Sequence, residues 1–584
     1  MKFLRNLLAV LVGLFLFSFI AIFIFIGMMA SLGSSLGETK VNVEANSILR
    51  IDLNRTVEEV TADDPFAVAF SNVKAPLGLL DLKRALTYAK TDDKIKGIYL
   101  DCGQVAAGYA SLQELRGALL DFKESGKFVV SYSEMYSEAG YYLASAADEV
   151  LVSQESLMFE FDGISYNAMF IKGLLDKLGI EPEIYRVGEF KGAVEPFLRK
   201  DLSPENELQI SSFINSIYDN ILTEISSSRN IPVATLKTIS SEMQAFEIQD
   251  ALKARLIDRL VYLDQVKDNL RERLEIERDD EIKFINIEKY IKVADPTTSS
   301  LNRIAVVVAS GDIISGKGEG NSVGSDDFVK IFEDIRKDDN IKAVVLRINS
   351  PGGSGLASDV IWREVSLTKE KKPVIASMSD LAASGGYYLA MPCDTIVANP
   401  TTITGSIGVF GLMFNFEPFL NDKLGITVDD VNTGKHSDMF SMMRTHTSEE
   451  RVMMQKMIDN FYETFIGKVA QGRNMSVDEI KKIAEGRVWT GDQALDNGLV
   501  DLLGNFETAV DIAANKAGID DYKLRYYPKQ KTIVEQLLEA FNPEAEARIL
   551  KSALGEDYIY LKKMKELKRM TGIQTRMPYD LTIK

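Results

Sequence analysis

Ser384 and Lys191 are the two residues whose types and surroundings best suit catalysis, although they lie far apart in the chain. Ser384 stands between two alanines and two glycines, in residues 382–386. A serine hydroxyl is a weak nucleophile until a neighbouring base accepts its proton. Lysine is such a base only when its amine is neutral, and burial in apolar surroundings lowers the lysine pKa in that direction. We therefore predict a nucleophile and its general base.

The neighbours of Lys191 would shift the pKa of its amine in opposite directions. Glu189 and Glu195 would favour the charged amine, so we expect both carboxylates to point away from it. The apolar residues available to surround the amine are Phe190, Ala193, Val194, Pro196 and Phe197.

The chain contains the same unit twice. A single register across such a length indicates an internal duplication. One constant offset aligns residues 92–97 with 338–343, residues 140–144 with 386–390 and residues 176–180 with 422–426.

The two copies differ at both candidate catalytic positions. Opposite Ser384 the first copy has Glu138, and opposite Lys191 the second copy has Ser437. Each copy therefore lacks what the other supplies, which predicts one composite site shared between the two halves.

An acyl-transfer site also needs hydrogen-bond donors for the oxyanion that develops on the substrate, and backbone N–H groups serve well. Gly352 and Gly353 follow a predicted strand in residues 349–355, and glycine permits a sharp turn and a close approach to substrate. The matching residues 103–108 of the first copy lack the paired glycines. We expect Gly352 or Gly353 to donate to the oxyanion.

Ser406 follows the candidate nucleophile in the short segment 404–408. We expect its hydroxyl to hydrogen-bond the lysine amine and to orient it. A serine with only a turn-forming role fits the same pattern.

Strands alternate with helices in each copy, and this order must position the candidate residues. Apolar strands between helices indicate an α/β fold with a βαβ layout and a buried sheet. The predicted strands are residues 304–308, 343–348 and 373–377 in the second copy and 97–100 in the first, and helical spacing predicts helices at 326–336, near 358–368 and around Leu82, Ala85, Leu86 and Ala89.

Length and composition indicate the number of domains and exclude some classes of function. A chain of 584 residues is too long for one core, so at least two domains are expected. The formal net charge of −18, without a Lys/Arg cluster, argues against nucleic acid as a partner. We expect Cys102 and Cys393 to be buried free thiols, and two cysteines with two histidines do not supply a zinc site. We expect neither a metal nor a cofactor.

The N-terminus carries the clearest local signal. Residues 7–30 are almost wholly apolar, and a helix of that length rises about 36 Å, enough to cross a bilayer core. Lys2 and Arg5 precede it, so the positive-inside rule leaves them in the cytoplasm and the remaining chain outside. A cleaved signal peptide is the competing interpretation, but its apolar region is usually about 7 to 15 residues long. We expect one uncleaved anchor.

In combination, these motifs resemble the signal peptide peptidase A (protease IV) family in its long, duplicated form. The resemblance implies two tandem crotonase-like (Clp protease-like) domains and a Ser/Lys dyad. It implies that Ser384 is the nucleophile, Lys191 the general base, Ser406 an aid to the lysine, and Gly352 or Gly353 an oxyanion donor. The motifs that carry the resemblance are residues 191–197, 350–353, 383–387, 398–400 and 404–408.

We expect the chain to divide into five parts. We expect a membrane anchor at 1–33, a first crotonase-like domain with the base at 47–293, a linker at 294–302, a second crotonase-like domain with the nucleophile at 303–521, and a tail at 522–584 without an assigned function.

The same resemblance implies a task and a location. Such enzymes are membrane-bound serine endopeptidases that degrade remnant signal peptides after preprotein processing, as tetramers on the outer (periplasmic) face of the bacterial cytoplasmic membrane. We therefore expect signal peptides and other hydrophobic peptides as substrates, the lipid bilayer as a partner through residues 7–30, and a homotetramer.

Three other interpretations stay open. A Ser-His-Asp triad would use His446 or His436, which lies beside Lys435 and one position from the counterpart of Lys191. A crotonase-like fold also serves acyl-CoA chemistry, because fold does not fix function. The third is an inactive membrane scaffold. Substitution of Lys191, Lys435 and His436, a CoA-binding assay and labelling with a serine-reactive phosphonate separate these cases.

Overall fold

The computed structural model describes residues 13, 17, 20, 41–61, 74–294, 300–318, 320–529 and 572–577. Almost all of the predicted anchor at residues 1–33, and residues 295–299 of the predicted linker at 294–302, lie outside these residues. Within the described ranges, no helix has both the length and the hydropathy needed to cross a bilayer.

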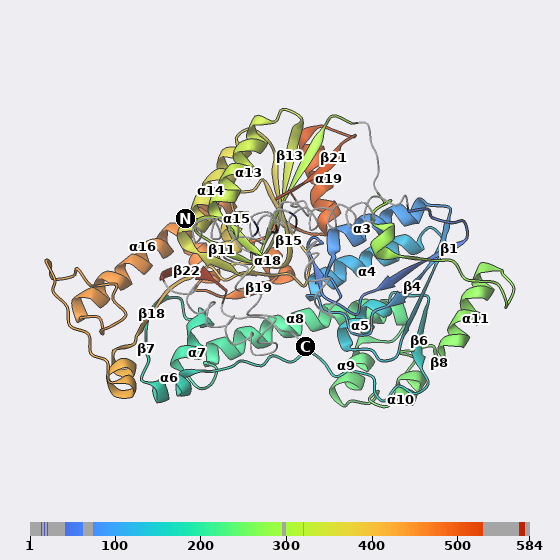
Figure 1. Ribbon diagram of the computed structural model, residues 1–584, viewed down its shortest axis with the longest axis horizontal. Coiled ribbons are helices and arrows are strands. Elements are labelled where there is room, and N and C mark those ends of the chain that lie inside the picture. Colours follow the sequence, from blue (N-terminus) through green and yellow to red (C-terminus); the bar gives the residue numbers. More distant parts are fainter. Residues whose placement is uncertain are drawn as a thin grey trace, which may run out of the picture.

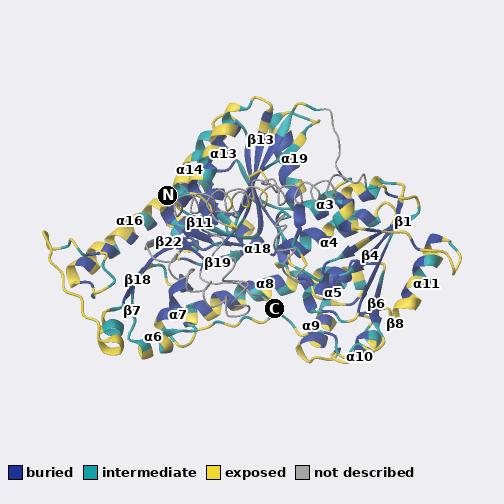
Figure 2. Cartoon of the chain, in the orientation of Figure 1, coloured by how far each residue is buried: buried dark blue, intermediate teal, exposed yellow. Residues whose placement is uncertain are grey.

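A parallel sheet forms the centre of the first half (Figure 1). Its order is β8-β6-β5-β4-β1-β9, and every neighbouring pair is parallel. Its strands are largely buried, as expected when helices cover both faces of a parallel sheet (Figure 2). The strands are β1 (Ser47–Asp52), β4 (Ile95–Asp101), β5 (Phe128–Ser133), β6 (Glu149–Ser153), β8 (Arg259–Val261) and β9 (Phe284–Asn286), with the short pair β2 (Val57–Glu58) and β3 (Leu77–Gly78) nearby in sequence.

The second half repeats this sheet. Its order β20-β16-β15-β13-β10-β21 matches the first strand for strand, which confirms the internal duplication. Residues 523–527, at the start of the predicted tail, form β21 and pair with β10. The strands are β10 (Arg303–Ser310), β13 (Ile341–Ser350), β15 (Val374–Ala383), β16 (Thr395–Ala398), β20 (Leu502–Leu503) and β21 (Lys523–Tyr527), and β17 (Ile403–Gly405) and β19 (Val488–Thr490) continue the sheet beyond β15.

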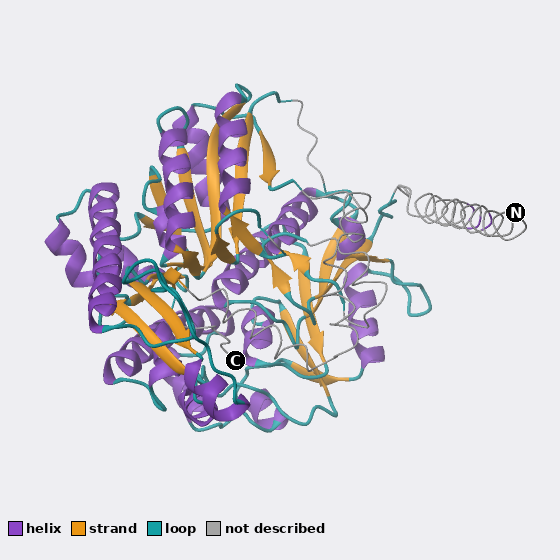
Figure 3. Ribbon diagram, turned by 60° about the vertical axis from the view of Figure 1, so that its left-hand side comes forward, coloured by secondary structure: helices purple, strands orange, loops and turns teal. Residues whose placement is uncertain are grey.

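Helices lie beside the sheets of both halves (Figure 3). The first half has α3 (Leu79–Thr91), α4 (Tyr109–Lys123), α5 (Glu138–Ala144), α8 (Pro204–Arg229), α9 (Val233–Ser241), α10 (Ile248–Lys253), α11 (Leu263–Leu274) and α12 (Ile287–Tyr290). The second half has α13 (Ser325–Lys337), α14 (Gly355–Lys369), α15 (Gly385–Ala390), α16 (Ser448–Arg473), α17 (Val477–Ile483), α18 (Gly491–Asp496) and α19 (Phe506–Ala517).

A third sheet joins the two halves. Its order is β12-β11-β14-β22-β18-β7. The first-half strand β7 pairs antiparallel with β18 of the second half along its whole length, and β7 then leads into the segment that carries Lys191. The strands are β7 (Glu181–Val187), β11 (Asp312–Ile314), β12 (Ser322–Gly324), β14 (Gly352–Ser354), β18 (Val409–Asn415) and β22 (Gly572–Arg576), with α6 (Lys172–Leu178), α7 (Glu195–Leu198), the 3-10 turn Gly192–Val194 and the π-helical segment Phe419–Leu424 near them in sequence.

The predicted strands and helices are confirmed, with longer bounds. The strand expected at residues 373–377 is β15, which continues to the residue before Ser384. The strand expected at 343–348 is β13, which ends one residue before Pro351. The candidate catalytic segments therefore follow directly after the carboxyl ends of these two strands.

Candidate active site

Ser384 lies in a strained turn between β15 and α15. Its φ is 55°, a conformation that is uncommon for any residue other than glycine. Its backbone N–H donates to the Gly405 carbonyl at 2.8 Å, and its carbonyl accepts from the Tyr388 N–H at 2.9 Å. The strand and the helix together hold the hydroxyl at a fixed point, where it is fully buried.

Lys191 reaches this hydroxyl from the first half of the chain. Its Nζ lies 2.9 Å from Ser384 Oγ, 3.0 Å from the Ser406 carbonyl oxygen and 3.0 Å from Ser406 Oγ. The contact forms within one chain, a point that the sequence left open. Two predicted site residues, Ser384 and Ser406, therefore meet at the amine of the third, Lys191.

Burial holds the pKa of Lys191 well below its usual value, because the amine is fully enclosed and the charged form loses its hydration. A neutral amine has one lone pair, which can accept the Ser384 O–H, while its own N–H groups donate to Ser406. The arrangement can therefore take a proton from the serine.

The two acidic neighbours of Lys191 point elsewhere, as the sequence analysis required. Glu189 is exposed. Glu195 is buried, but its carboxylate accepts the Ser203 N–H at 3.1 Å. Desolvation is accordingly the one cause that shifts the Lys191 pKa.

Two glycines leave room for the lysine side chain. A Cβ on Gly486 would lie 2.7 Å from the Lys191 Cβ, and a Cβ on Gly408 would lie 3.2 Å from its Cδ. Gly486 also has a φ of 79°. Gly408 belongs to the predicted motif at 404–408, whereas nothing in the sequence distinguished Gly486.

Gln209 is a supporting residue that the sequence analysis missed. From α8, its amide donates to the Phe190 carbonyl at 2.8 Å and accepts the Val488 N–H at 3.1 Å. One buried side chain thus ties the lysine segment to β19, and β19 pairs with β17, which leads to Ser406. A glutamine within an amphipathic helix gives no sequence signal of this role.

The glycine pair at 352 and 353 lies beside the serine. A Cβ on Gly352 would lie 2.6 Å from the Gly385 nitrogen. The Gly352 N–H donates to Ser350 Oγ at 3.1 Å, and Gly353 pairs with Thr575 of β22 in the antiparallel ladder. The Gly385 N–H opens α15 directly after Ser384, a position with no helical acceptor, and it is a second candidate donor that the sequence analysis did not name.

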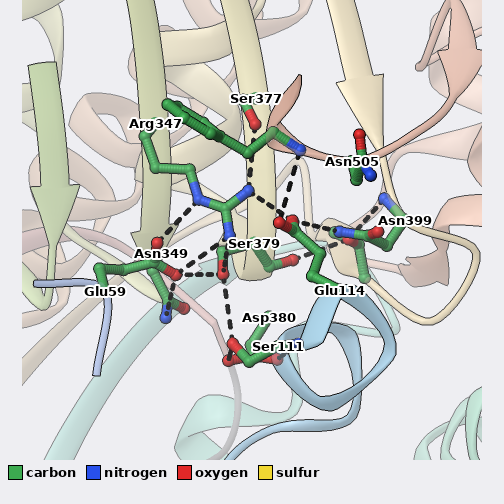
Figure 4. A network of polar contacts seen from close by, with 12 residues as sticks. Glu59, Ser111, Glu114, Arg347, Asn349, Ser377, Ser379, Asp380, Asn399 and Asn505 are labelled. Carbon is green, nitrogen blue, oxygen red and sulfur yellow. Dashed lines mark hydrogen bonds and ion pairs between the residues drawn. The ribbon is translucent and has the colours of Figure 1, made fainter. Parts of the chain in front are cut away.

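A buried network of charges joins the two halves of the chain (Figure 4). Arg347 on β13 is fully buried, and its guanidinium lies 2.8 Å from a Glu59 oxygen and 2.7 Å from a Glu114 oxygen. Asp380 on β15 accepts the Ser111 N–H at 2.8 Å. The buried charges of Arg347 and Asp380 in the second half are therefore bonded to groups of the first half.

The same network reaches the strands that carry the candidate catalytic segments. Asn349, near the end of β13, donates to Glu59 at 3.2 Å and accepts the Leu381 N–H of β15 at 3.2 Å. It therefore links the strand before Gly352 to the strand before Ser384 and fixes their spacing.

The side chains considered as alternatives to Lys191 as the base contact other residues. His436 contacts Glu450 at 3.0 Å, and Lys435 forms an ion pair with Glu449. The His446 ring lies 2.8 Å from the Tyr185 hydroxyl. The geometry gives these side chains no contact with Ser384 in the described part of the chain.

Glu138 takes the place of the serine in the first half. Its carboxylate accepts the N–H groups of Asp162 at 3.0 Å and Gly163 at 2.7 Å, and burial raises its pKa to about 7. Ser437, opposite Lys191, is exposed. Both predicted cysteines are buried and free.

Comparison with known proteins identifies relatives of both halves. The profile of peptidase family S49 matches residues 121–277 and 366–520. The chloroplastic serine protease SPPA of Arabidopsis thaliana is 34% identical over 516 residues, which cover 87% of this chain and 75% of that protein. Protease 4 of Salmonella typhi is 35% identical over 484 residues, with coverages of 81% and 77%, and Protease 4 of Haemophilus influenzae is 32% identical over 525 residues, with coverages of 86% and 84%.

Proposed function

Because the chain belongs to peptidase family S49 and is a serine protease, we propose that it is an endopeptidase with a Ser384–Lys191 dyad. The observation that carries the proposal is the 2.9 Å contact between the Lys191 amine and the Ser384 hydroxyl, made where burial favours the neutral amine. Ser406 holds that amine through its carbonyl and hydroxyl oxygens.

The chemistry follows from these positions. Lys191 accepts the hydroxyl proton as Ser384 Oγ attacks the substrate carbonyl carbon. The negative oxygen of the tetrahedral intermediate takes N–H bonds from Gly353 and Gly385. The lysine then gives its proton to the leaving amine, and the amide C–N bond breaks to leave an ester on the serine. Water, deprotonated by the same lysine, hydrolyses that ester and restores the hydroxyl.

We place the enzyme at a membrane and assign it remnant signal peptides and other hydrophobic peptides. Two observations support this: the apolar run at residues 7–30, and the relative in Enterococcus faecium, 33% identical over 237 residues, named as a putative signal peptide peptidase SppA. A bilayer anchor would hold the site at the surface that such peptides occupy, on the outer face of a bacterial cytoplasmic membrane.

Two finer structural proposals accompany the function. Each half, with its parallel sheet between helices, is proposed to have the crotonase-like fold. The other is a homotetramer. A segment that exposes several large apolar side chains, which a partner subunit would cover, supports association between copies of the chain. Its exposed residues are Leu424, Ile426, Val428, Val431, Phe440 and Met443.

Substitutions test the dyad directly. We expect Ser384→Ala and Lys191→Ala each to lower kcat for a hydrophobic peptide substrate by at least about 10³-fold, because a positioned base and nucleophile contribute on this order. His436→Ala and Lys435→Ala are the controls, and both should keep wild-type activity. Wild-type turnover by Lys191→Ala would refute the assignment.

A further inference from the structure

Arg487 lies between two aromatic rings beside the segment that carries the general base. Its guanidinium carbon lies 5.1 Å from the centre of the Phe190 ring and 4.2 Å from the centre of the Trp489 ring. Phe190 directly precedes Lys191, and its N–H donates to the Glu485 carbonyl at 3.1 Å. An aromatic face attracts a guanidinium ion and favours stacking of its plane. The rings therefore hold a cation next to the lysine segment.

The backbone of the same segment is bonded to the other side of the site. The Arg487 carbonyl accepts the Ser406 N–H at 2.7 Å. A Cβ on Gly405 would lie 2.8 Å from Trp489 Cδ1, and the Gly405 carbonyl accepts the Ser384 N–H at 2.8 Å. Arg487 thus belongs to the structure that surrounds the dyad.

The Arg487 guanidinium has no acidic partner. Within the described part of the chain, its Nε is buried without a hydrogen-bond acceptor, and no carboxylate offsets the burial that lowers its pKa. Arg525 shows the more usual arrangement, because it stacks on Tyr527 and also pairs with Asp338 at 3.2 Å. A guanidinium stays charged and presents a planar fork of N–H donors that fits a carboxylate. Arg487 is therefore prepared to bind a carboxylate that the described residues do not supply.

The proposed chemistry brings the leaving part of a peptide to this side of the site. Lys191 gives its proton to the leaving amine, so the residues after the scissile bond begin next to the lysine. Phe190, the neighbour of that lysine, stacks on Arg487. The cation therefore lies on the side toward which the leaving part of the peptide extends.

A released peptide carries a group that a segment within a protein lacks. Processing of a preprotein hydrolyses the bond after the signal peptide, so the remnant ends in a free α-carboxylate, which is ionised at neutral pH. The same residues within the intact preprotein continue as a neutral amide. An arginine that pairs with the carboxylate would distinguish the two.

We propose that Arg487 binds the C-terminal α-carboxylate of the peptide substrate and so directs the enzyme to released peptides in preference to segments of longer chains. This inference rests on the proposed function, because the position of the leaving part follows from the roles of Ser384 and Lys191. Arg487 acts here as a specificity residue, and its rings at Phe190 and Trp489 hold it in place.

Two hydrophobic peptides of the same sequence test this in the full chain, one ending in a carboxylate and one in a carboxamide. We expect kcat/KM of the wild-type enzyme to be roughly tenfold higher for the acid, because a charge-assisted pair contributes on this order. Arg487→Met keeps an unbranched apolar side chain between the rings but removes the fork, and it should abolish the preference. Arg487→Lys keeps the charge and should retain part of the preference.

Binding gives a second measurement that needs no turnover. The full-chain variant Ser384→Ala should bind the acid peptide roughly tenfold more tightly than the amide, and the added substitution Arg487→Met should make the two affinities equal. The matched control is Arg525→Met, which removes a stacked arginine that already has a carboxylate partner and should leave the preference at its wild-type value.

The outcomes separate this inference from the proposed function. Equal kcat/KM for acid and amide in the wild-type enzyme would overturn the inference and leave the dyad intact. A loss by the same factor on both peptides in Arg487→Met would mean that the arginine only supports the fold of the lysine segment, and this too would overturn it. A peptidase activity that survives Ser384→Ala would instead remove the proposed function.

Discussion

At the residue scale, Lys191 combines a cost in stability with a gain in reactivity. Its full burial lowers its pKa, so at any pH between the lowered pKa and the usual value of 10.5 the folded chain holds a neutral amine that the unfolded chain would protonate. The same burial that opposes folding makes the amine a base, and the contact with Ser384 gives that base a proton to accept.

The first prediction concerns the effect of the buried lysine on the stability of the folded chain. Unfolding takes up a proton at Lys191, so the destabilisation is greatest at low pH and disappears as pH rises to the usual lysine value of 10.5. We expect Lys191→Met to raise Tm at pH 7 by roughly 2–4 °C, a shift that about 1 kcal/mol gives in a domain of this size. Calorimetry across pH should show the gain shrinking toward pH 10.5, and a lower Tm at pH 7 would contradict the buried neutral amine.

The second prediction concerns the space around the lysine. We expect Gly486→Ala to lower kcat by roughly 10²-fold, because the new Cβ would displace Lys191 and a misplacement near 1 Å can have that effect. Gly518→Ala is the matched control, since Gly518 has a similar φ of 65° but no atom within 4 Å of its added Cβ. Equal losses in both variants would mean that backbone strain, and not contact with the lysine, explains the effect.

At the element scale, the strands and helices of both copies could be predicted because apolar periodicity marks each one. The split of the two catalytic candidates could also be predicted, since Glu138 and Ser437 stand where their counterparts should be. The third sheet could not, because it pairs β7, β18 and β22 from distant parts of the chain and no local pattern encodes a partner. Gln209 stayed hidden for the same reason, as its two partners become neighbours only after folding.

The third prediction belongs to α8. We expect Gln209→Leu to lower kcat by roughly tenfold with little change in KM, because it leaves the Phe190 carbonyl and the Val488 N–H without their buried partner and loosens the lysine segment. Asn215→Ala, on the exposed side of the same helix, is the control and should keep wild-type kinetics. An effect on KM alone would point to substrate binding instead of positioning.

At the scale of the whole molecule, a site assembled from two halves needs a fixed junction. The antiparallel pairing of β7 with β18 supplies one contact between the halves, and the Arg347 network supplies another. Burial alone would raise the pKa of Glu114, but Arg347 and Lys83 outweigh it and lower the pKa to about 2. Stability from this carboxylate is therefore present above its ordinary pKa of 4.5 and is lost as pH falls toward 2.

The fourth prediction tests the junction. We expect Arg347→Met to lower the free energy of unfolding by about 3–5 kcal/mol, because it leaves Glu59 and Glu114 buried without their cation. Arg303→Met, which breaks a partly exposed pair with Asp338, should cost about 1 kcal/mol or less. Urea unfolding measures both, and equal losses would contradict a special role for the network.

The most direct measurement is the rate at which a peptidyl phosphonate labels Ser384, followed by mass spectrometry as a function of pH. The wild-type rate should rise as pH passes the lowered pKa of Lys191, and Lys191→Ala should lose this rate while small amines added to the buffer restore part of it. Labelling of Lys191→Ala at the wild-type rate, with the same pH dependence, would contradict a dyad formed by the two halves of the chain.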